Sequence, residues 1–258
     1  MSMFTRCTKI IPSSCEDIKI SCYSVRTFEY GNTKISSSPI NISFDNIAFY
    51  INNETFPLLC CKLFNFSHEL EMFDFDNCKI EKIEKYFSER VQNGTIKITN
   101  NRITIIEKHT FRNLKVRQII LSKNSIAWIE DEAFANLANL MSLDLRRNHL
   151  STLSSNSFVD LPTLANIDLS FNSIRHLHRG VFRFCQAPGA SIVLACNEIS
   201  DIDNAFEGML STGLNLFLGG NRIEHLPVGA FDSHSFFEVD FRFNPLNKVS
   251  LDFCRRNC

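Results

Sequence analysis

The chain has 258 residues, with 27 Lys and Arg against 28 Asp and Glu, which gives a formal net charge of −1 at pH 7. A charge this close to zero provides no bulk attraction to nucleic acid or to an anionic membrane surface, so we expect neither class of partner. The sequence contains no run of about 18 apolar residues and therefore predicts no membrane-spanning helix.

The first third of the chain contains alternating segments whose register the sequence leaves open. One candidate strand is Ile40-Asn-Ile42-Ser-Phe44. A second candidate starts at Phe49 and Ile51 and lies 24 residues ahead of a pattern that recurs from Leu70 onward. We expect one degenerate copy of that pattern here, in either register.

If the copies of the pattern from Leu70 onward stack on one another, residues 1–69 are also expected to close one end of the stack. Stacked coils expose core and a strand edge at an open end, so a cap is needed. The segment Ile18-Lys-Ile20-Ser-Cys22 alternates in polarity and lies close to Cys7 and Cys15, which favours a hairpin held by cysteines. We therefore predict a cysteine-containing N-terminal cap plus the degenerate copy within 1–69.

An asparagine then recurs inside one apolar frame, at steps of 23, 24, 24, 25, 24 and 23 residues. Each copy reads apolar-x-apolar-x-x-Asn-x-apolar-x-x-apolar, and the first apolar pair alternates as in a short strand with one buried face. The Asn amide can pair with backbone groups that each turn leaves unpaired. The asparagines are Asn101, Asn124, Asn148, Asn172, Asn197, Asn221 and Asn244, and Cys78 takes the same place in an eighth copy.

A phenylalanine recurs later in each copy. This spacing predicts a second column in which stacked rings fill the convex half of the core. The frame loosens at Cys185-Gln-Ala-Pro-Gly-Ala190, where we expect an irregular convex loop. The column consists of Phe87, Phe111, Phe134, Phe158, Phe182, Phe206 and Phe231.

These motifs resemble the leucine-rich repeat family in its typical extracellular subclass. The third copy carries the frame as Leu143, Leu145, Asn148, Leu150 and Leu153. The resemblance covers residues 70–251 as about eight repeats. It implies an α/β solenoid, an arc with a parallel β-sheet on the concave face and irregular or short helical segments on the convex face. Toll-like receptor ectodomains, small leucine-rich proteoglycans and secreted insect immune proteins are built in this way.

The last residues resemble the start of a C-terminal cysteine cap of the same family. Asn244-Pro-Leu-Asn matches its entry, and Cys254 and Cys258 follow. The usual Trp and the later cysteines are missing, so we expect residues 252–258 to be a truncated cap.

Cysteines gathered near both ends favour disulfides and an oxidising compartment. Cys78 and Cys185 occupy core positions and are expected to be buried thiols, whereas Cys196 should face the concave side. Met1 to Cys7 lacks the apolar core of a signal peptide, which leaves open a missing leading segment, a processed fragment or a cytosolic protein. We expect an extracellular protein, secreted or at the cell surface, with glycosylation at four sequons, Asn41, Asn53, Asn65 and Asn93.

Motifs of catalysis are absent from the sequence. It has no Gly-rich phosphate loop, no Gly-x-Ser-x-Gly elbow and no His-Glu-x-x-His. His176 and His178 flank a core Leu177, but no Cys or carboxylate lies near them at a ligand spacing. We therefore expect no enzyme activity, no cofactor and no metal.

Strand residues between the buried ones should point outward onto the concave face. In the last four repeats these columns bring aromatic and small residues together, with basic residues on the N-terminal side. Exposed aromatic side chains beside arginine are typical of a binding hot spot. The predicted partner-binding residues are Lys123, Arg146, Arg147, Phe171, Val193, Phe217, Arg242 and Phe243.

A period in the twenties is typical of solenoids, which usually act as binding surfaces. We predict a non-catalytic interaction module that binds a protein or glycan through its concave face, in extracellular recognition of the immune or adhesion type. The alternatives are a cytosolic scaffold or adaptor, and a receptor ectodomain fragment without independent function.

Overall fold

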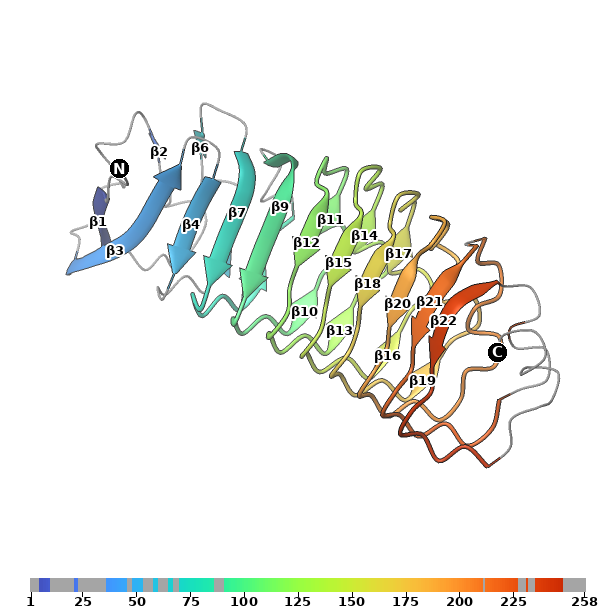
Figure 1. Ribbon diagram of the computed structural model, residues 1–258. Helices are drawn as coiled ribbons and strands as arrows, with labels where there is room; N and C mark the ends of the chain where they lie inside the picture. Colours follow the sequence, from blue (N-terminus) through green and yellow to red (C-terminus); the bar gives the residue numbers. More distant parts are fainter. Residues whose placement is uncertain are drawn as a thin grey trace.

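The computed structural model describes residues 71–85, 91–210, 212–226, 231 and 235–247, together with the backbone of the strands before residue 71. The chain winds into stacked coils that form an elongated arc (Figure 1). One sheet of eleven strands runs along the whole array in the order β1-β3-β4-β7-β9-β12-β15-β18-β20-β21-β22. A parallel sheet with one strand per coil is the arrangement that the repeat predicts.

The repeat strands lie in register, one copy apart. Ile119 pairs with Leu143, and Leu143 pairs with Ile167, so the same slot of each repeat forms one column. In the strands of Ile119 and Leu143 the middle residue is buried and its two neighbours are half-buried, as expected for one buried face. The strands are β7 (Leu70–Asp76), β9 (Val91–Thr99), β12 (Gln118–Ile120), β15 (Ser142–Asp144), β18 (Asn166–Asp168), β20 (Ser191–Val193), β21 (Leu214–Phe217) and β22 (Phe236–Asp240).

The N-terminal strands extend the sheet with a change of direction. Strand β4 (Ala48–Asn52) pairs parallel with β7, with Phe49 opposite Phe73, so the second candidate register is the one that continues the repeat. Strand β3 (Ser36–Asp45) contains the other candidate and lies antiparallel to β4, and β1 (Thr5–Lys9) is antiparallel to β3. The side chains of the N-terminal cysteines and residues 248–258 lie outside the described part, so the predicted caps stay predictions.

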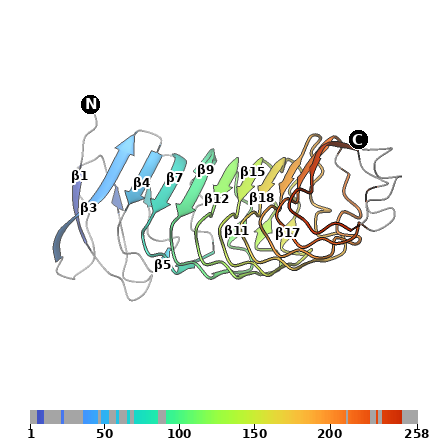
Figure 2. The ribbon, with the colours of Figure 1, turned by 60° about the horizontal axis from the view of Figure 1, so that its bottom comes forward.

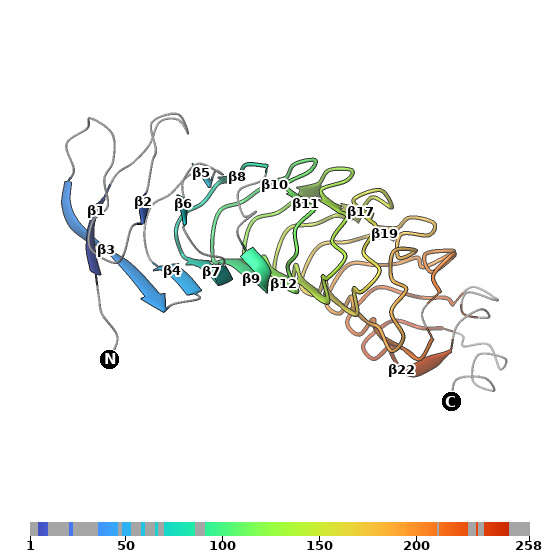
Figure 3. The ribbon, with the colours of Figure 1, turned by 90° about the horizontal axis from the view of Figure 1, so that it is seen from above.

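The far side of the coils is built from short parallel strands and turns (Figures 2 and 3). The short helices expected there are not found among the described residues. Instead, the Phe111 and Asn113 amides donate to Ala133 and Ala135 of the next coil, at 2.9 and 3.0 Å, and so cannot form helical bonds. The short strands are β2 (Ser21–Cys22), β5 (Leu58–Leu59), β6 (Asn65–Phe66), β8 (Lys82–Ile83), β10 (Ile105–Ile106), β11 (Phe111–Arg112), β13 (Trp128–Ile129), β14 (Phe134–Ala135), β16 (Thr152–Leu153), β17 (Phe158–Val159) and β19 (His176–Leu177).

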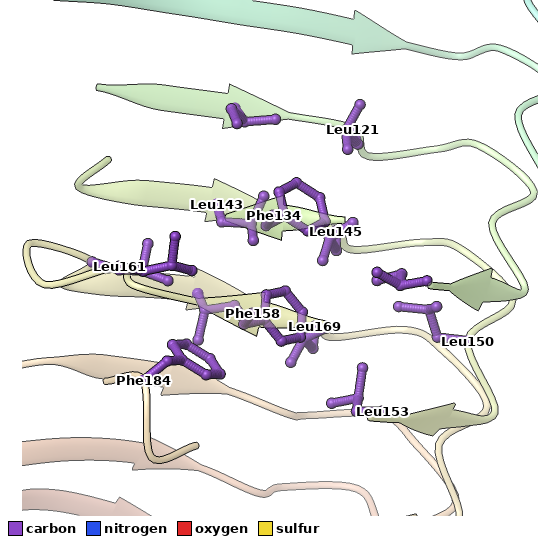
Figure 4. Close-up of a cluster of buried hydrophobic side chains, with 14 of the residues drawn as sticks. Leu121, Phe134, Leu143, Leu145, Leu150, Leu153, Phe158, Leu161, Leu169 and Phe184 are labelled. Carbon is purple, nitrogen blue, oxygen red and sulfur yellow. The ribbon is translucent and has the colours of Figure 1, made fainter. Parts of the chain in front are cut away.

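Phenylalanine rings from Phe111 to Phe231 form the predicted column in the core, and Phe87 lies outside the described residues. Phe111 and Phe134 stack at 5.1 Å between centroids, and Phe134 and Phe158 at 5.5 Å. At the irregular loop, Phe184 enters the column and packs against Phe158 at 4.9 Å (Figure 4). The column resumes between Phe182 and Phe206 at 5.5 Å, so the extra ring fills the place where the frame loosens.

Each repeat asparagine joins two coils through its side chain, which is buried in all of them except the half-buried Asn244. The Oδ1 of Asn148 accepts the Ile126 N–H at 3.0 Å, one coil back. Its Nδ2 donates to Leu121 O, also one coil back, at 3.1 Å, and to Leu145 O of its own coil at 2.9 Å. The same pattern recurs at the other repeat asparagines, so the backbone groups released at the end of each strand are satisfied by the next Asn.

We expect Asn148→Ala to lower the free energy of unfolding by about 2–3 kcal/mol, because it orphans buried backbone groups at about 1–3 kcal/mol each. A melting temperature about 5–10 °C lower would follow for a chain of this size. Asn166→Ala is the matched control, since Asn166 is exposed on the neighbouring strand. Equal melting temperatures for the two variants would contradict the bridging role.

Candidate functional site

The face of the sheet that points away from the core, here called the sheet face, carries the predicted binding residues. Asp168 pairs with Val193 and Val193 with Phe217 on successive strands, so Val193 and Phe217 are direct neighbours. Both are half-buried, and Ala195 and Gly219 lie in the next column of the same face. The structure thus places the expected apolar residues side by side on β20 and β21.

The residue before each repeat asparagine forms a column with left-handed backbone. The φ values are 53° at Asn77, 55° at Asn100, 58° at Lys123, 55° at Arg147, 55° at Phe171, 57° at Cys196, 69° at Gly220 and 60° at Phe243. We call these eight residues the left-handed column. Its members are adjacent along the array, because the Phe171 amide donates to Ala195 O of the next coil at 3.0 Å.

The left-handed turn brings the following Asn inward, and it has a conformational cost for most side chains. Glycine and asparagine tolerate this region, whereas a bulky residue is strained by about 1–2 kcal/mol. Asn77, Asn100 and Gly220 fit the turn. The turn is strained at four of the positions predicted to bind a partner, which are Lys123, Arg147, Phe171 and Phe243.

Two of the four strained side chains contact each other. The Arg147 guanidinium carbon lies 4.9 Å from the centre of the Phe171 ring, a cation–π contact worth about 0.5–1 kcal/mol at an exposed site. Phe171 is nevertheless 49% exposed, and Phe243 is 87% exposed. Within the described part of the chain, neither Lys123 nor Arg147 forms an ion pair. Their charges therefore remain available to a ligand.

The other two predicted arginines are held by acids of their own strands. Arg146 Nε lies 3.1 Å from Asp144 Oδ2. Arg242 donates from both Nε and Nη2 to the Asp240 carboxylate at 2.9 Å, and this hydrogen bonding lowers the pKa of Asp240 and raises that of Arg242. The spacing of Asp and Arg two residues apart could have indicated this pairing, and it makes Arg146 and Arg242 less available than Lys123 and Arg147.

Carboxylates lie in the column of Val193 and Phe217 on the sheet face. Asp144 and Asp168 are direct partners on β15 and β18. Burial raises the pKa of Asp144 above its ordinary 3.8, and the nearby Asp168 charge acts in the same direction. The Asp168 Oδ1 accepts the Ser170 N–H at 2.9 Å. The face is therefore mixed in charge. Its left-handed column carries two cations without an ion pair among the described residues, and acids lie two columns away.

The described cysteines lie where the sequence places them. Cys78 and Cys185 are buried, and burial raises the pKa of the Cys185 thiol to about 12. Cys196 is exposed in the left-handed column. Disulfides are predicted only for cysteines outside the described side chains and stay predictions.

Among the four predicted glycosylation sites, only the side chain of Asn93 is described. It is exposed and lies in a bulge of β9, where a Cβ at the following Gly94 would come within 1.8 Å of Glu71 O. Asn139 Nδ2 donates to Asn93 Oδ1 at 3.0 Å. Asn41 and Asn65 lie in β3 and β6, and Asn53 lies outside the described residues.

Within the described ranges, no group of three or more His, Cys, Asp and Glu is placed to hold a metal ion. The His178 Nε2 lies 3.1 Å from Thr152 Oγ1, and His176 and His178 are both exposed. The same residues contain no helix with the length and apolar character of a membrane crossing.

The family profile described as leucine rich repeat matches residues 115–174. The matched segment therefore consists of leucine-rich repeats, and the neighbouring coils of the sheet continue the same arrangement. No curated protein matches its sequence. A crystal structure of a TLR13–ssRNA13 complex has a similar fold, with a TM-score of 0.60 and 21% identity. The similarity covers 79% of this chain and 32% of that one, so this leucine-rich repeat array spans about a third of that protein and resembles Toll-like receptor ectodomains in fold.

This comparison corrects the exclusion of nucleic acid as a partner class. The neighbour of the same fold was solved with a single-stranded RNA. The exclusion rested on a net charge of −1, but net charge describes the whole chain, whereas phosphates respond to local groups such as Lys123 and Arg147. Net charge therefore cannot exclude such a partner for a leucine-rich repeat surface.

We expect Phe243→Asn to raise the free energy of unfolding by about 0.5–1 kcal/mol, because Asn tolerates the left-handed region and little ring area is buried. Phe237→Asn is the control, since Phe237 is 83% exposed but lies in β22 without a positive φ. Thermal melts of both variants check the prediction. Phe237→Asn relieves no strain and is not expected to gain stability. If Phe243→Asn is no more stable than Phe237→Asn, the strain argument is contradicted.

Proposed function

We propose that the chain is a non-catalytic binding module that holds a protein ligand on its sheet face, the concave side of the arc. The observation that carries the proposal is the run of Lys123, Arg147 and Phe171 on consecutive coils, exposed and without an ion-pair partner among the described residues. Val193 and Phe217 add apolar surface on the next two coils, in another column of the same face. Aromatic side chains beside arginine dominate the energetics of many interfaces.

The similarity to a TLR13–ssRNA13 complex supports a second candidate, single-stranded RNA. Its phosphates would pair with Lys123 and Arg147, and a base would stack on Phe171. Such binding weakens as salt rises, because condensed counterions are released from the RNA. Removing one phosphate contact in Lys123→Ala would reduce the salt slope by about one.

The binding face is tested by comparing Phe171→Ser with Trp128→Ser. Both rings are exposed to the same degree, 49% and 48%, but Trp128 lies in β13, outside the main sheet. Binding of secreted proteins and of labelled single-stranded RNA to the immobilised chain is measured for both variants. We expect Phe171→Ser alone to lose at least about tenfold in affinity, because aromatic hot spots contribute about 2 kcal/mol or more. Equal loss in the two variants would reject the sheet face.

We further propose an extracellular or endosomal setting, supported by the resemblance to Toll-like receptor ectodomains and by the four sequons. The chain from its natural source should lose mass when N-linked glycans are removed enzymatically. Thr95→Ala should carry one glycan less than the wild type, because it removes the sequon and keeps Asn93 in its bulge. An unchanged mass after glycan removal would instead favour the cytosolic scaffold.

A further inference from the structure

We infer that the segment of the left-handed column from Lys123 to Phe171 is the specificity-determining edge of the sheet face, and that it takes a protein segment in which a carboxylate lies next to an apolar side chain. This inference rests on the proposed function and names the ligand chemistry of the same site. It depends on three observations, which are the backbone conformation of the edge, its free charges and the acids beside it.

The fold itself does not require bulky residues in this column. Asn77, Asn100 and Gly220 occupy the same slot with φ values of 53°, 55° and 69°, so small tolerant residues complete the turn. Lys123 is exposed, and within the described residues neither it nor Arg147 forms an ion pair. The Arg147 side chain lies over the ring of the half-exposed Phe171. These side chains are strained and make few packing contacts, so they do not stabilise the fold. Such strained residues are typical of functional sites.

The two cations are arranged for a carboxylate. The Arg147 guanidinium carbon lies over the Phe171 ring, and the guanidinium N–H groups can form a two-point hydrogen bond to an acid. Lys123 lies one coil earlier, about 4.8 Å away along the array, and can add a second charge. Phe171 is one coil later in the same direction, and its exposed half can cover an apolar side chain.

This spacing suits an extended peptide. Residues in an extended chain advance by about 3.3 Å each, so positions one to three apart would reach from Lys123 and Arg147 to Phe171. Val193 and Phe217 offer further apolar contact beyond it. The expected ligand therefore carries Asp or Glu within about three residues of an aliphatic or aromatic residue.

The acids of the sheet face favour a single carboxylate over a repeating polyanion. Asp144 and Asp168 lie on the same face, two columns from the edge, and Asp240 lies further along the array. A peptide can present one acid to Arg147 and neutral or basic residues to Asp168. A chain of phosphates would bring negative charge to all of these carboxylates, which weakens its binding. RNA is therefore the outcome that the experiment must distinguish.

The full chain is used to select from a random peptide library displayed on phage, and the selected peptides are measured against four variants. We expect enrichment of an acid beside an apolar residue, and a loss of about tenfold or more in affinity for Arg147→Asn and Phe171→Asn. Lys123→Asn should bind more weakly while its melting temperature is unchanged or higher. Trp128→Ser, whose ring is as exposed as that of Phe171 but lies in β13 outside the main sheet, should bind as the wild type does.

Three results would overturn the inference. Selected peptides without acids, or peptides that bind Arg147→Asn and Phe171→Asn as well as the wild type, would reject the edge while the binding function stands. Labelled single-stranded RNA that binds in place of any peptide, and depends on Arg147, would replace the protein ligand and keep the face. Absence of binding by peptides, secreted proteins and RNA alike would reject both the inference and the proposed function.

Discussion

The asparagine amide that joins neighbouring coils is the interaction on which the rest of the structure depends. Each coil leaves backbone N–H and C=O groups unpaired where the strand ends, and in the dry interior those groups need partners. Asn172 shows the solution, because its Oδ1 accepts the Leu150 N–H at 3.0 Å and its Nδ2 donates to Leu145 O and Leu169 O. Every coil is thereby tied to its predecessor by polar bonds, while leucines and phenylalanines fill the space between.

The functional surface follows from the same constraint. To bring the Asn inward, the chain must leave the strand through a left-handed residue, and that residue is carried to the edge of the sheet face. Successive coils then present these residues in a row, spaced by about one strand separation. A partner therefore meets a regular edge whose chemistry varies from coil to coil, from Asn100 through Lys123 and Arg147 to Phe171. The stacking of the coils sets the spacing between these side chains, and their identities determine which ligand the edge can bind.

The periodic features were predictable from the sequence because they depend on spacing alone. The asparagine ladder, the phenylalanine column and the adjacency of Val193 and Phe217 are confirmed. The short convex strands were not predicted, since the amides of Phe111 and Asn113 pair between coils and such pairing leaves no periodic signal within one coil. The ion pairs of Arg146 and Arg242 were missed as well, although each arginine follows an aspartate by two residues and this spacing could have indicated them.

Amide hydrogen exchange at Ile126, Leu150 and Ile174 tests the central claim most directly, because the backbone N–H of each donates to the Oδ1 of the next repeat asparagine at 3.0 Å. The account predicts that these amides exchange as slowly as those of the buried sheet strands, and that Asn172→Ala accelerates Leu150 more than Ile126. Exchange of all three at the rate of exposed loop amides in the unaltered chain would contradict it.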